Sequence, residues 1–198
     1  MTPSTYPLSD RFAEAFTFAH ERHAAHDHYR KGTSIPYIAH LMGVAAIVLE
    51  HGGDEVEAVA GLLHDIVEDT ETTLAEVRER FGEPVARIVD VCTDANGPGE
   101  KPPWRPRKER YVARVASAPL AARRVIAADK LHNALAIIAD HETGGDRLWE
   151  RFNAPPRDTA WYYGAVRDAL AQPADLPAPL LHQLDAAVAD LTSRAGAS

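Results

Sequence analysis

Apolar residues recur every three or four positions through most of this chain, and polar residues fill the intervals. This spacing gives an α-helix one apolar face, whereas a strand would show strict alternation, and no convincing alternating run lies between turn signals. The periodic segments lie at residues 10–29, 37–51, 55–70, 73–81, 83–93, 107–117, 120–140, 146–152, 158–171 and 178–193. The pattern therefore predicts an all-α fold, a bundle of roughly eight to ten helices.

Residues that favour helix ends mark several of these boundaries. Asp54 is suited to cap the helix that follows it, and Thr73 with Glu76 three residues later resembles a capping box. Between residues 94 and 106, two glycines and four prolines exclude regular structure. This loop leads into a basic helix, and it either closes over an anion or serves as a solvated connector.

The length of 198 residues suits one domain with a sizeable core. We expect residues 1–198 to form a single domain, with a core over about residues 10–170. The helix at 178–193 is expected as an appendage that either covers the core or makes a dimer. The sequence thus leaves a monomer and a homodimer open.

Cysteine content and hydropathy restrict the class of protein. The single cysteine, Cys92, excludes an intrachain disulfide and a cysteine-based zinc site. No apolar run approaches the length that spans a bilayer, and the first residues lack the basic and apolar regions of a signal peptide. A cytoplasmic protein without membrane contact is therefore expected.

The net charge of −8 argues against non-specific binding of nucleic acid, which requires a basic footprint. Local clusters can oppose the global sign, so a small anionic ligand stays possible. Such basic clusters occur at Arg30 and Lys31, along residues 101–110, and at Arg123 and Arg124.

One stretch concentrates acidic groups. On a helix over residues 58–70, the side chains of His64, Asp65, Glu68 and Asp69 fall within an arc of roughly 140°. This face lacks the Lys and Arg partners that are usual on exposed acidic helices. Gly61 on the same face leaves room for an ion, its water or a packed neighbour. A bound cation explains this arrangement better than a solvated acidic helix does.

Two further polar residues lie on helix faces that are otherwise apolar. His40 shares its face with Val44 and Ile47, and Asp129 sits in an apolar segment with Asn133 one turn on. A buried carboxylate is costly unless it is paired or binds a metal. With His64 and Asp65, these groups would make a nitrogen and oxygen donor set that suits Mn, Fe, Zn, Co or Ni.

A cation with four protein ligands leaves room for water and a phosphate oxygen, as metal-assisted hydrolysis requires. Glu68 and Asp69, one turn beyond His64 and Asp65, are then candidates to act on that water. Four early histidines, within residues 20–28, are another candidate metal site. With no carboxylate or cysteine assigned beside them as a further ligand, a polar flank is favoured for His20, His23, His26 and His28.

The positions of these groups resemble a known family. The set of His40, His64 with Asp65, and Asp129 is similar to that of the HD superfamily of metal-dependent phosphohydrolases. More narrowly, three segments resemble the hydrolase domain of RelA/SpoT proteins and the stand-alone small alarmone hydrolases over about residues 10–170. These segments are residues 30–40 (RKGTSIPYIAH), 62–70 (LLHDIVEDT) and 128–133 (ADKLHN).

The resemblance implies a helical HD-type fold and a Mn²⁺ site, with other divalent transition metals possible. It implies that His40, His64, Asp65 and Asp129 hold the metal and that Glu68 and Asp69 position or activate the attacking water. It also implies that Arg30, Lys31 and Asn133 contact the substrate, a small anionic nucleotide. The implied reaction hydrolyses the 3′-pyrophosphate of (p)ppGpp to GDP or GTP and pyrophosphate.

Two departures from the family pattern leave alternatives open. Leu41 follows the metal histidine where the family often has proline, and the loop from Gly97 to Arg107 differs from the family segment. The substrate could therefore be another nucleotide, such as NADPH, which would lose its 2′-phosphate, or an adenosine alarmone. A nucleotide-sensing HD protein without turnover is the second alternative, disfavoured because every expected catalytic group is present.

Overall fold

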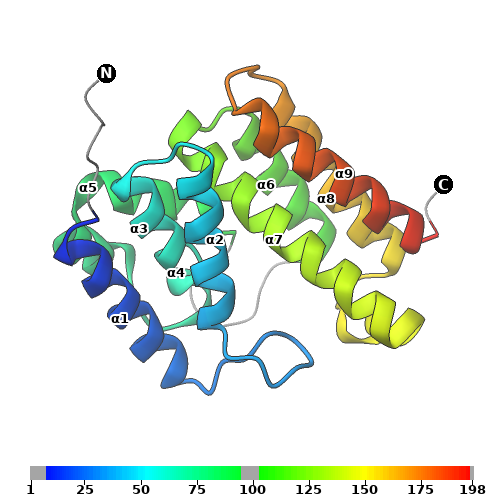
Figure 1. The fold of residues 1–198 in the computed structure, drawn as a ribbon, viewed down its shortest axis with the longest axis horizontal. Helices are drawn as coiled ribbons and strands as arrows, with labels where there is room; N and C mark the ends of the chain where they lie inside the picture. The colour runs from blue at the N-terminus through cyan, green and yellow to red at the C-terminus, as the bar shows by residue number, and fades with distance from the viewer. Residues whose placement is uncertain (1–7, 95–102, 197–198) are drawn as a thin grey trace.

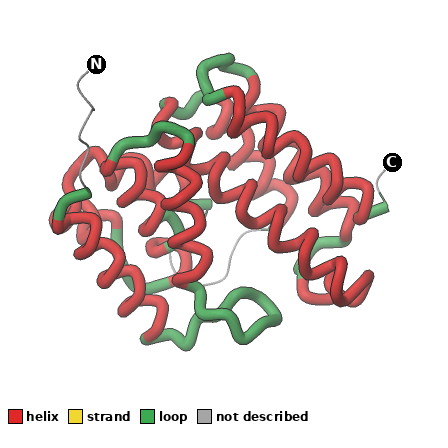
Figure 2. Tube along the Cα trace, viewed as in Figure 1, coloured by secondary structure: helices red, strands yellow, loops and turns green. Residues whose placement is uncertain are grey.

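The computed structural model describes residues 8–94 and 103–196, and regular structure within these ranges is helical (Figures 1 and 2). The elements are α1 (Asp10–Ala24), α2 (Ile38–Glu50), α3 (Glu55–Leu63), α4 (Ile66–Asp69), α5 (Leu74–Cys92), α6 (Trp104–Ala116), α7 (Leu120–Gly144), the 3-10 helix η1 (Gly145–Arg151), α8 (Pro156–Ala171) and α9 (Ala178–Arg194). An isolated bridge joins Tyr29 and Pro36. The prediction of an all-α fold is confirmed.

Helix α7 is the central element of the bundle. It contacts α2, α3 and α5 on one side and η1, α8 and α9 on the other (Figure 1). Its sequence is apolar almost all round, and side chains such as Val125, Ile126 and Leu131 are buried. A helix that is apolar on every face is stable only when neighbours cover it, which explains its position.

Helix α9 packs along α7 and α8, so it covers the core rather than standing apart from it (Figure 1). Its packing set is Leu180, Leu184, Ala187, Val188 and Leu191. The assignment of residues 1–198 to a single domain stays a prediction. Among the described helices, none combines the length and apolar character that crossing a bilayer requires.

The predicted helix starts are confirmed by their caps. The side chain of Asp54 accepts from the backbone N–H of Glu57, whose own carboxylate accepts from the N–H of Asp54. The hydroxyl of Thr73 accepts from the N–H of Glu76. Such caps satisfy backbone donors that a helix start leaves without partners. Gly82 has a left-handed φ of 78°, which breaks α5 where two separate helices were predicted.

Three helix boundaries differ from the predictions. Helix α1 ends at Ala24 rather than near residue 29, because Asp27 has a φ of 47° that no α-helix allows. Helix α6 begins at Trp104 rather than Arg107, since a proline at 106 is tolerated in a first turn where N–H groups lack partners anyway. The stretch 55–70 is not one helix: α3 ends at Leu63, and α4 begins at Ile66.

Gly61 serves the packing of α3 on α2. A Cβ atom at this position would lie 3.3 Å from Cα of Ala45, which is tighter than ordinary contact. The absent side chain therefore lets the two helix backbones approach. Of the three explanations for this glycine, the packed neighbour is the one that the structure supports.

Candidate metal centre and its polar cavity

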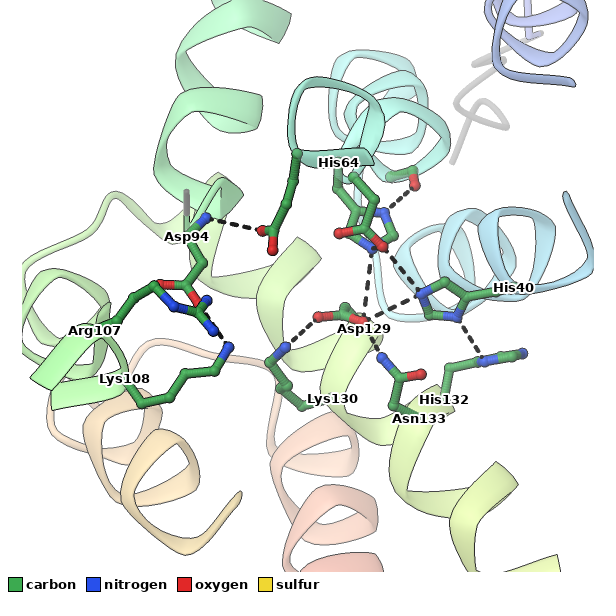
Figure 3. A network of polar contacts seen from close by, with 12 residues as sticks. His40, His64, Asp94, Arg107, Lys108, Asp129, Lys130, His132 and Asn133 are labelled. Atoms are coloured by element: carbon green, nitrogen blue, oxygen red, sulfur yellow. Dashed lines mark hydrogen bonds and ion pairs between the residues drawn. The ribbon is translucent and has the colours of Figure 1, made fainter. Parts of the chain in front are cut away.

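Four predicted ligands, which we call the candidate metal centre, lie close together: His40, His64, Asp65 and Asp129. Potential ligand atoms of the first three lie within 4.8 Å of one another, and Asp129 joins them through its contacts with the two histidines. His40 comes from α2 and Asp129 from α7, while His64 and Asp65 occupy the link between α3 and α4 (Figure 3). Nε2 of His40 lies 3.3 Å from Oδ1 of Asp129 and 3.8 Å from Oδ2 of Asp65. Nε2 of His64 lies 3.0 Å from Oδ2 of Asp65 and 3.6 Å from Oδ1 of Asp129.

The two imidazoles present lone pairs to this point. Nδ1 of His64 lies 2.8 Å from the carbonyl oxygen of Gly61, which can only accept, so Nδ1 carries a hydrogen, and Nε2 offers a lone pair to a cation when the ring is neutral. Nδ1 of His40 lies 3.0 Å from Nδ1 of His132 (Figure 3). Among the described residues, neither buried Nε2 atom has a hydrogen-bond partner. A second hydrogen bond that fixes the ring is typical of metal-binding histidines. The donor set therefore fits a divalent cation.

The charges at the centre also favour a cation. Burial works against ionisation of Asp129, but Lys130, His40 and His64 together hold its pKa well below the usual range. Burial likewise lowers the pKa of His64, yet Asp65 and Asp129 outweigh it and raise that pKa well above the ordinary value. The buried carboxylate of Asp129 and the partly buried one of Asp65 thus draw positive charge to this point, which a divalent cation supplies more fully than a proton does.

Each carboxylate of the centre has a second partner. The hydroxyl of Tyr37 donates to Oδ2 of Asp65. Asp129 accepts from Nζ of Lys130 at 2.7 Å and from Nδ2 of Asn133 at 2.5 Å (Figure 3). Such contacts hold ligand oxygens in fixed positions. Of these three partners, Asn133 was predicted as a site residue from the sequence, whereas Tyr37 and Lys130 were not.

The missed residues gave weak sequence signals. Lys130 directly follows Asp129, and adjacent helix positions point about 100° apart, so no contact was expected. Tyr37 is the first residue of the periodic segment 37–51 and lies just before α2, a position that gives no sign of a contact with Asp65. His132 was part of the motif that carried the resemblance but received no role, although it lies against His40.

A cavity of about 190 Å³ opens beside the candidate metal centre. Five carboxylates and two lysines line it, together with aromatic and small polar residues. The lining residues are Tyr37, Asp65, Glu68, Asp69, Cys92, Asp94, Lys108, Tyr111, Asp129, Lys130, Asn133 and Tyr162. The structure thus brings the predicted catalytic residues Glu68 and Asp69 to the same cavity as the ligands. We call it the polar cavity.

The basic side of the polar cavity comes from α6 and α7. Lys108 lies 2.6 Å from Oδ2 of Asp94, which also pairs with Arg107 (Figure 3). Burial, reinforced by the nearby charge of Lys130, lowers the pKa of Lys108. Arg105 instead stacks 3.3 Å from the ring centre of Trp161 and does not line the cavity. Of the loop expected to close over an anion, residues 95–102 lie outside the described residues.

The predicted substrate-binding residues separate into two groups. Nη1 of Arg30 donates to Oδ1 of Asn133 at 3.0 Å, and Asn133 in turn donates to Asp129, so Arg30 is linked to the candidate metal centre through Asn133. Lys31 is exposed and donates to Asn153 at 3.2 Å, away from the residues that line the cavity. The other basic pair has structural contacts, since Arg123 pairs with Asp175 and Arg124 with Glu57.

Another cavity, of about 850 Å³, lies where α3 and α7 begin and along the second half of α5. Its lining is mostly apolar, and none of the predicted site residues contributes to it. Volume alone would select this cavity, but the convergent polar groups and shifted pKa values lie at the smaller one.

A second group of potential ligands forms from His23, His28 and Asp69, which we call the second cluster. The expectation that no carboxylate joins the early histidines is therefore wrong for three of them, since Nε2 of His26 also lies 2.7 Å from Oε2 of Glu71. Asp69 is distant in sequence, and only the packing of α1 against α4 brings it close.

Comparison with known proteins agrees with the resemblance seen in the sequence. A model of the HD domain family matches residues 15–149. A protein of Aquifex aeolicus (strain VF5) named guanosine-3′,5′-bis(diphosphate) 3′-pyrophosphohydrolase is 42% identical over 91 residues, which are 46% of this chain and 13% of that protein. A Danio rerio protein with the same name, followed by MESH1, is 42% identical over 126 residues, which are 61% of this chain and 65% of that protein.

A solved structure extends the likeness to almost the whole chain. It is described as a metazoan ortholog of SpoT that hydrolyses ppGpp, and it superposes with a TM-score of 0.73 at 25% sequence identity. The superposition covers 98% of this chain and 100% of that one. The matched family region holds all four residues of the candidate metal centre, and it spans more than half of the sequence. This chain belongs to the HD domain family.

Proposed function

We propose that this protein is a metal-dependent phosphohydrolase that removes pyrophosphate from the 3′ position of (p)ppGpp, leaving GDP or GTP. One observation carries the proposal: Glu68 and Asp69 line the same polar cavity as the ligands of the candidate metal centre. The names of the relatives support the substrate class, since they specify a guanosine 3′-pyrophosphohydrolase. Because this chain spans less than two thirds of either protein, the substrate is part of the proposal.

His40, His64, Asp65 and Asp129 would hold the cation. We propose Mn²⁺, which accepts this mixture of nitrogen and oxygen donors, as do other divalent transition metals. When bound, such a cation lowers the pKa of water and neutralises charge on a phosphoryl group. Its charge is needed for binding as well. The polar cavity has five carboxylates against two lysines, and without a cation this lining would repel pyrophosphate.

Glu68 and Asp69 are the groups proposed to act on water. A general base must lie within hydrogen-bond reach of the proton that it takes, and both carboxylates face the cavity where water would enter. Oε2 of Glu68 accepts from the backbone N–H of Asp94 at 3.2 Å, a contact that orients this carboxylate at the cavity.

The proposed reaction breaks one phosphorus–oxygen bond. The oxygen of water bonds to the phosphorus next to O3′, a carboxylate takes a proton from that water, and the bond from phosphorus to O3′ breaks. O3′ takes up a proton and stays on the nucleoside, and pyrophosphate leaves. Lys108 and Lys130 line the cavity where its negative charge would lie.

The polar cavity is smaller than the usual volume of roughly 300 Å³ or more for a ligand pocket. A pyrophosphoryl group is therefore the part of the substrate proposed to occupy it, and the nucleoside would extend beyond it. Asn133 contacts Asp129 and Arg30 contacts Asn133, and both are proposed to contact the substrate there.

A turnover assay tests the proposal. The protein is stripped with chelator, reloaded with Mn²⁺ and supplied separately with ppGpp, pppGpp, ppApp, NADPH, ATP and nucleoside monophosphates. We expect pyrophosphate release from ppGpp and pppGpp that requires the cation. Phosphate release from NADPH or monophosphates alone would overturn the substrate assignment. Tight nucleotide binding without any turnover would instead identify a sensor.

A further inference from the structure

We propose that the second cluster, His23, His28 and Asp69, is a second cation site that takes a divalent transition metal. It is separate from the candidate metal centre, with which it shares no ligand. His23 lies in the last turn of α1, His28 in the link to α2, and Asp69 at the end of α4. Each contributes one potential ligand atom, and the three atoms lie within 4.8 Å of one another.

The distances suit one ion. Nδ1 of His23 and Nδ1 of His28 are 2.9 Å apart, and Nδ1 of His28 lies 3.9 Å from Oδ2 of Asp69. At a usual metal–nitrogen distance of about 2.1 Å, neighbouring ligands of an octahedral ion are about 3 Å apart and opposite ligands about 4.2 Å. The distance between His23 and His28 matches that of neighbouring ligands, and the distance between His28 and Asp69 is nearer to that of opposite ligands. The mixed nitrogen and oxygen set suits Zn²⁺, Co²⁺ or Mn²⁺.

The state of the two imidazoles also suits a metal. Burial lowers the pKa of His23 to about 4, and it lowers that of His28 as well. Both rings are therefore neutral near pH 7, as ligands must be. The simplest alternative is one N–H···N hydrogen bond between the facing Nδ1 atoms. Counting bound metal distinguishes that hydrogen bond from a bound ion.

The backbone and a stacked ring hold the pair in place. The left-handed φ of 47° at Asp27 turns the chain back, and the N–H of His28 bonds to the carbonyl oxygen of His23 at 3.1 Å. The Tyr37 ring stacks on His28 with centres 4.1 Å apart and planes 11° apart. The hydroxyl of this tyrosine reaches Asp65. Tyr37 therefore stands between the second cluster and the candidate metal centre, with a contact to each.

Asp69 belongs both to the second cluster and to the lining of the polar cavity. A carboxylate has two oxygens, so one can bind a cation while the other accepts from water. A cation there would add positive charge beside a cavity lined with five carboxylates. The site itself rests on the geometry of its three residues and does not depend on hydrolysis.

Counting bound metal tests this proposal. The intact protein is stripped with chelator, saturated with Co²⁺, freed of excess ion and measured by elemental analysis and visible absorption. We expect two equivalents in the wild type, one in His28→Gln, one in Asp129→Ala and none in the double variant. His28 is only partly buried, so its replacement disturbs the core less than a change at His23 would. Circular dichroism verifies that each variant is folded.

The matched control is His20→Gln, an exposed histidine on the same helix as His23, which should keep two equivalents. One equivalent in the wild type would overturn the proposal, as would two in His28→Gln or none in Asp129→Ala. These counts are independent of turnover. If the wild-type protein binds two ions but does not hydrolyse ppGpp, the proposed function is rejected and the second cation site is still supported.

Discussion

The hydroxyl of Tyr37 donates to Oδ2 of Asp65, the same oxygen that lies 3.0 Å from Nε2 of His64. One ligand oxygen is thus held by a tyrosine on one side and faces an imidazole on the other. The tyrosine hydroxyl stays protonated, because burial first, and then Asp65 and Asp69, raise its pKa well above the ordinary value. This contact therefore acts as a fixed donor throughout the working pH range.

Removing this donor should weaken metal binding. In Tyr37→Phe the ring is kept and only the hydroxyl is lost, so Asp65 can rotate. Loss of a contact that orients a ligand typically costs about 10- to 100-fold in metal affinity, and we expect the lower end of that range. Titration with Mn²⁺ or Co²⁺ gives the affinity. Tyr29→Phe, an exposed tyrosine, is the control. Equal affinities for the two variants would contradict this role of Tyr37.

Lys130 should matter more for substrate than Lys31 does. Although burial lowers the pKa of Lys130, Asp129 outweighs it and raises that pKa well above the usual value, so the side chain stays charged in the polar cavity. We expect Lys130→Met to raise KM for ppGpp by about tenfold or more, because one charge-assisted hydrogen bond to the substrate is lost. Lys31→Met should change KM less, because Lys31 contacts Asn153 outside the cavity. Steady-state kinetics of both variants at saturating Mn²⁺ make the comparison.

A larger effect of Lys31→Met than of Lys130→Met would reverse the assignment. It would mean that the substrate extends to Lys31, as the family resemblance implies, and that the polar cavity is not its main anion site. Metal content measured in parallel separates loss of substrate binding from loss of the cation.

Buried His23 should make the metal-free protein less stable in acid. The ordinary pKa near 6.5 applies to the unfolded chain, and burial lowers the folded value to about 4. As the pH falls below 6.5, the unfolded chain binds a proton that the folded protein excludes, so the free energy of unfolding decreases until about pH 4. The shift corresponds to on the order of 3 kcal/mol over this interval.

Urea unfolding in chelator at several values between about pH 7 and pH 4.5 measures this dependence. His23→Gln should show a smaller slope than the wild type, and His182→Gln, an exposed histidine on α9, should match the wild type. Identical slopes in all three proteins would show that His23 does not titrate as described.

The sequence predicted the residues that stand out from a helical pattern. His40 and Asp129 were found because each is polar on an apolar helix face, and both are buried at the candidate metal centre. Glu68 and Asp69 were placed by assuming one continuous helix. Although that helix is broken at His64 and Asp65, both residues still line the polar cavity.

Contacts made by long side chains or by distant segments were not predictable in this way. Lys130 reaches back to its own neighbour, and His132 meets His40 across two helices. The second cluster depends on the left-handed turn at Asp27, and no glycine marks this turn in the sequence. In each case the contact is determined by how the chain packs in three dimensions, and the apolar periodicity of a single segment does not predict it.

The central claim is that metal-dependent hydrolysis uses a carboxylate beside the candidate metal centre. The most direct measurement is the single-turnover rate of pyrophosphate release from ppGpp by Glu68→Gln and by Glu71→Gln, an exposed neighbour whose side chain pairs with His26. Loss of a general base costs about 10²- to 10⁴-fold. We predict such a loss in Glu68→Gln with metal content unchanged, and a wild-type rate in Glu71→Gln. A wild-type rate in fully metal-loaded Glu68→Gln would contradict the account.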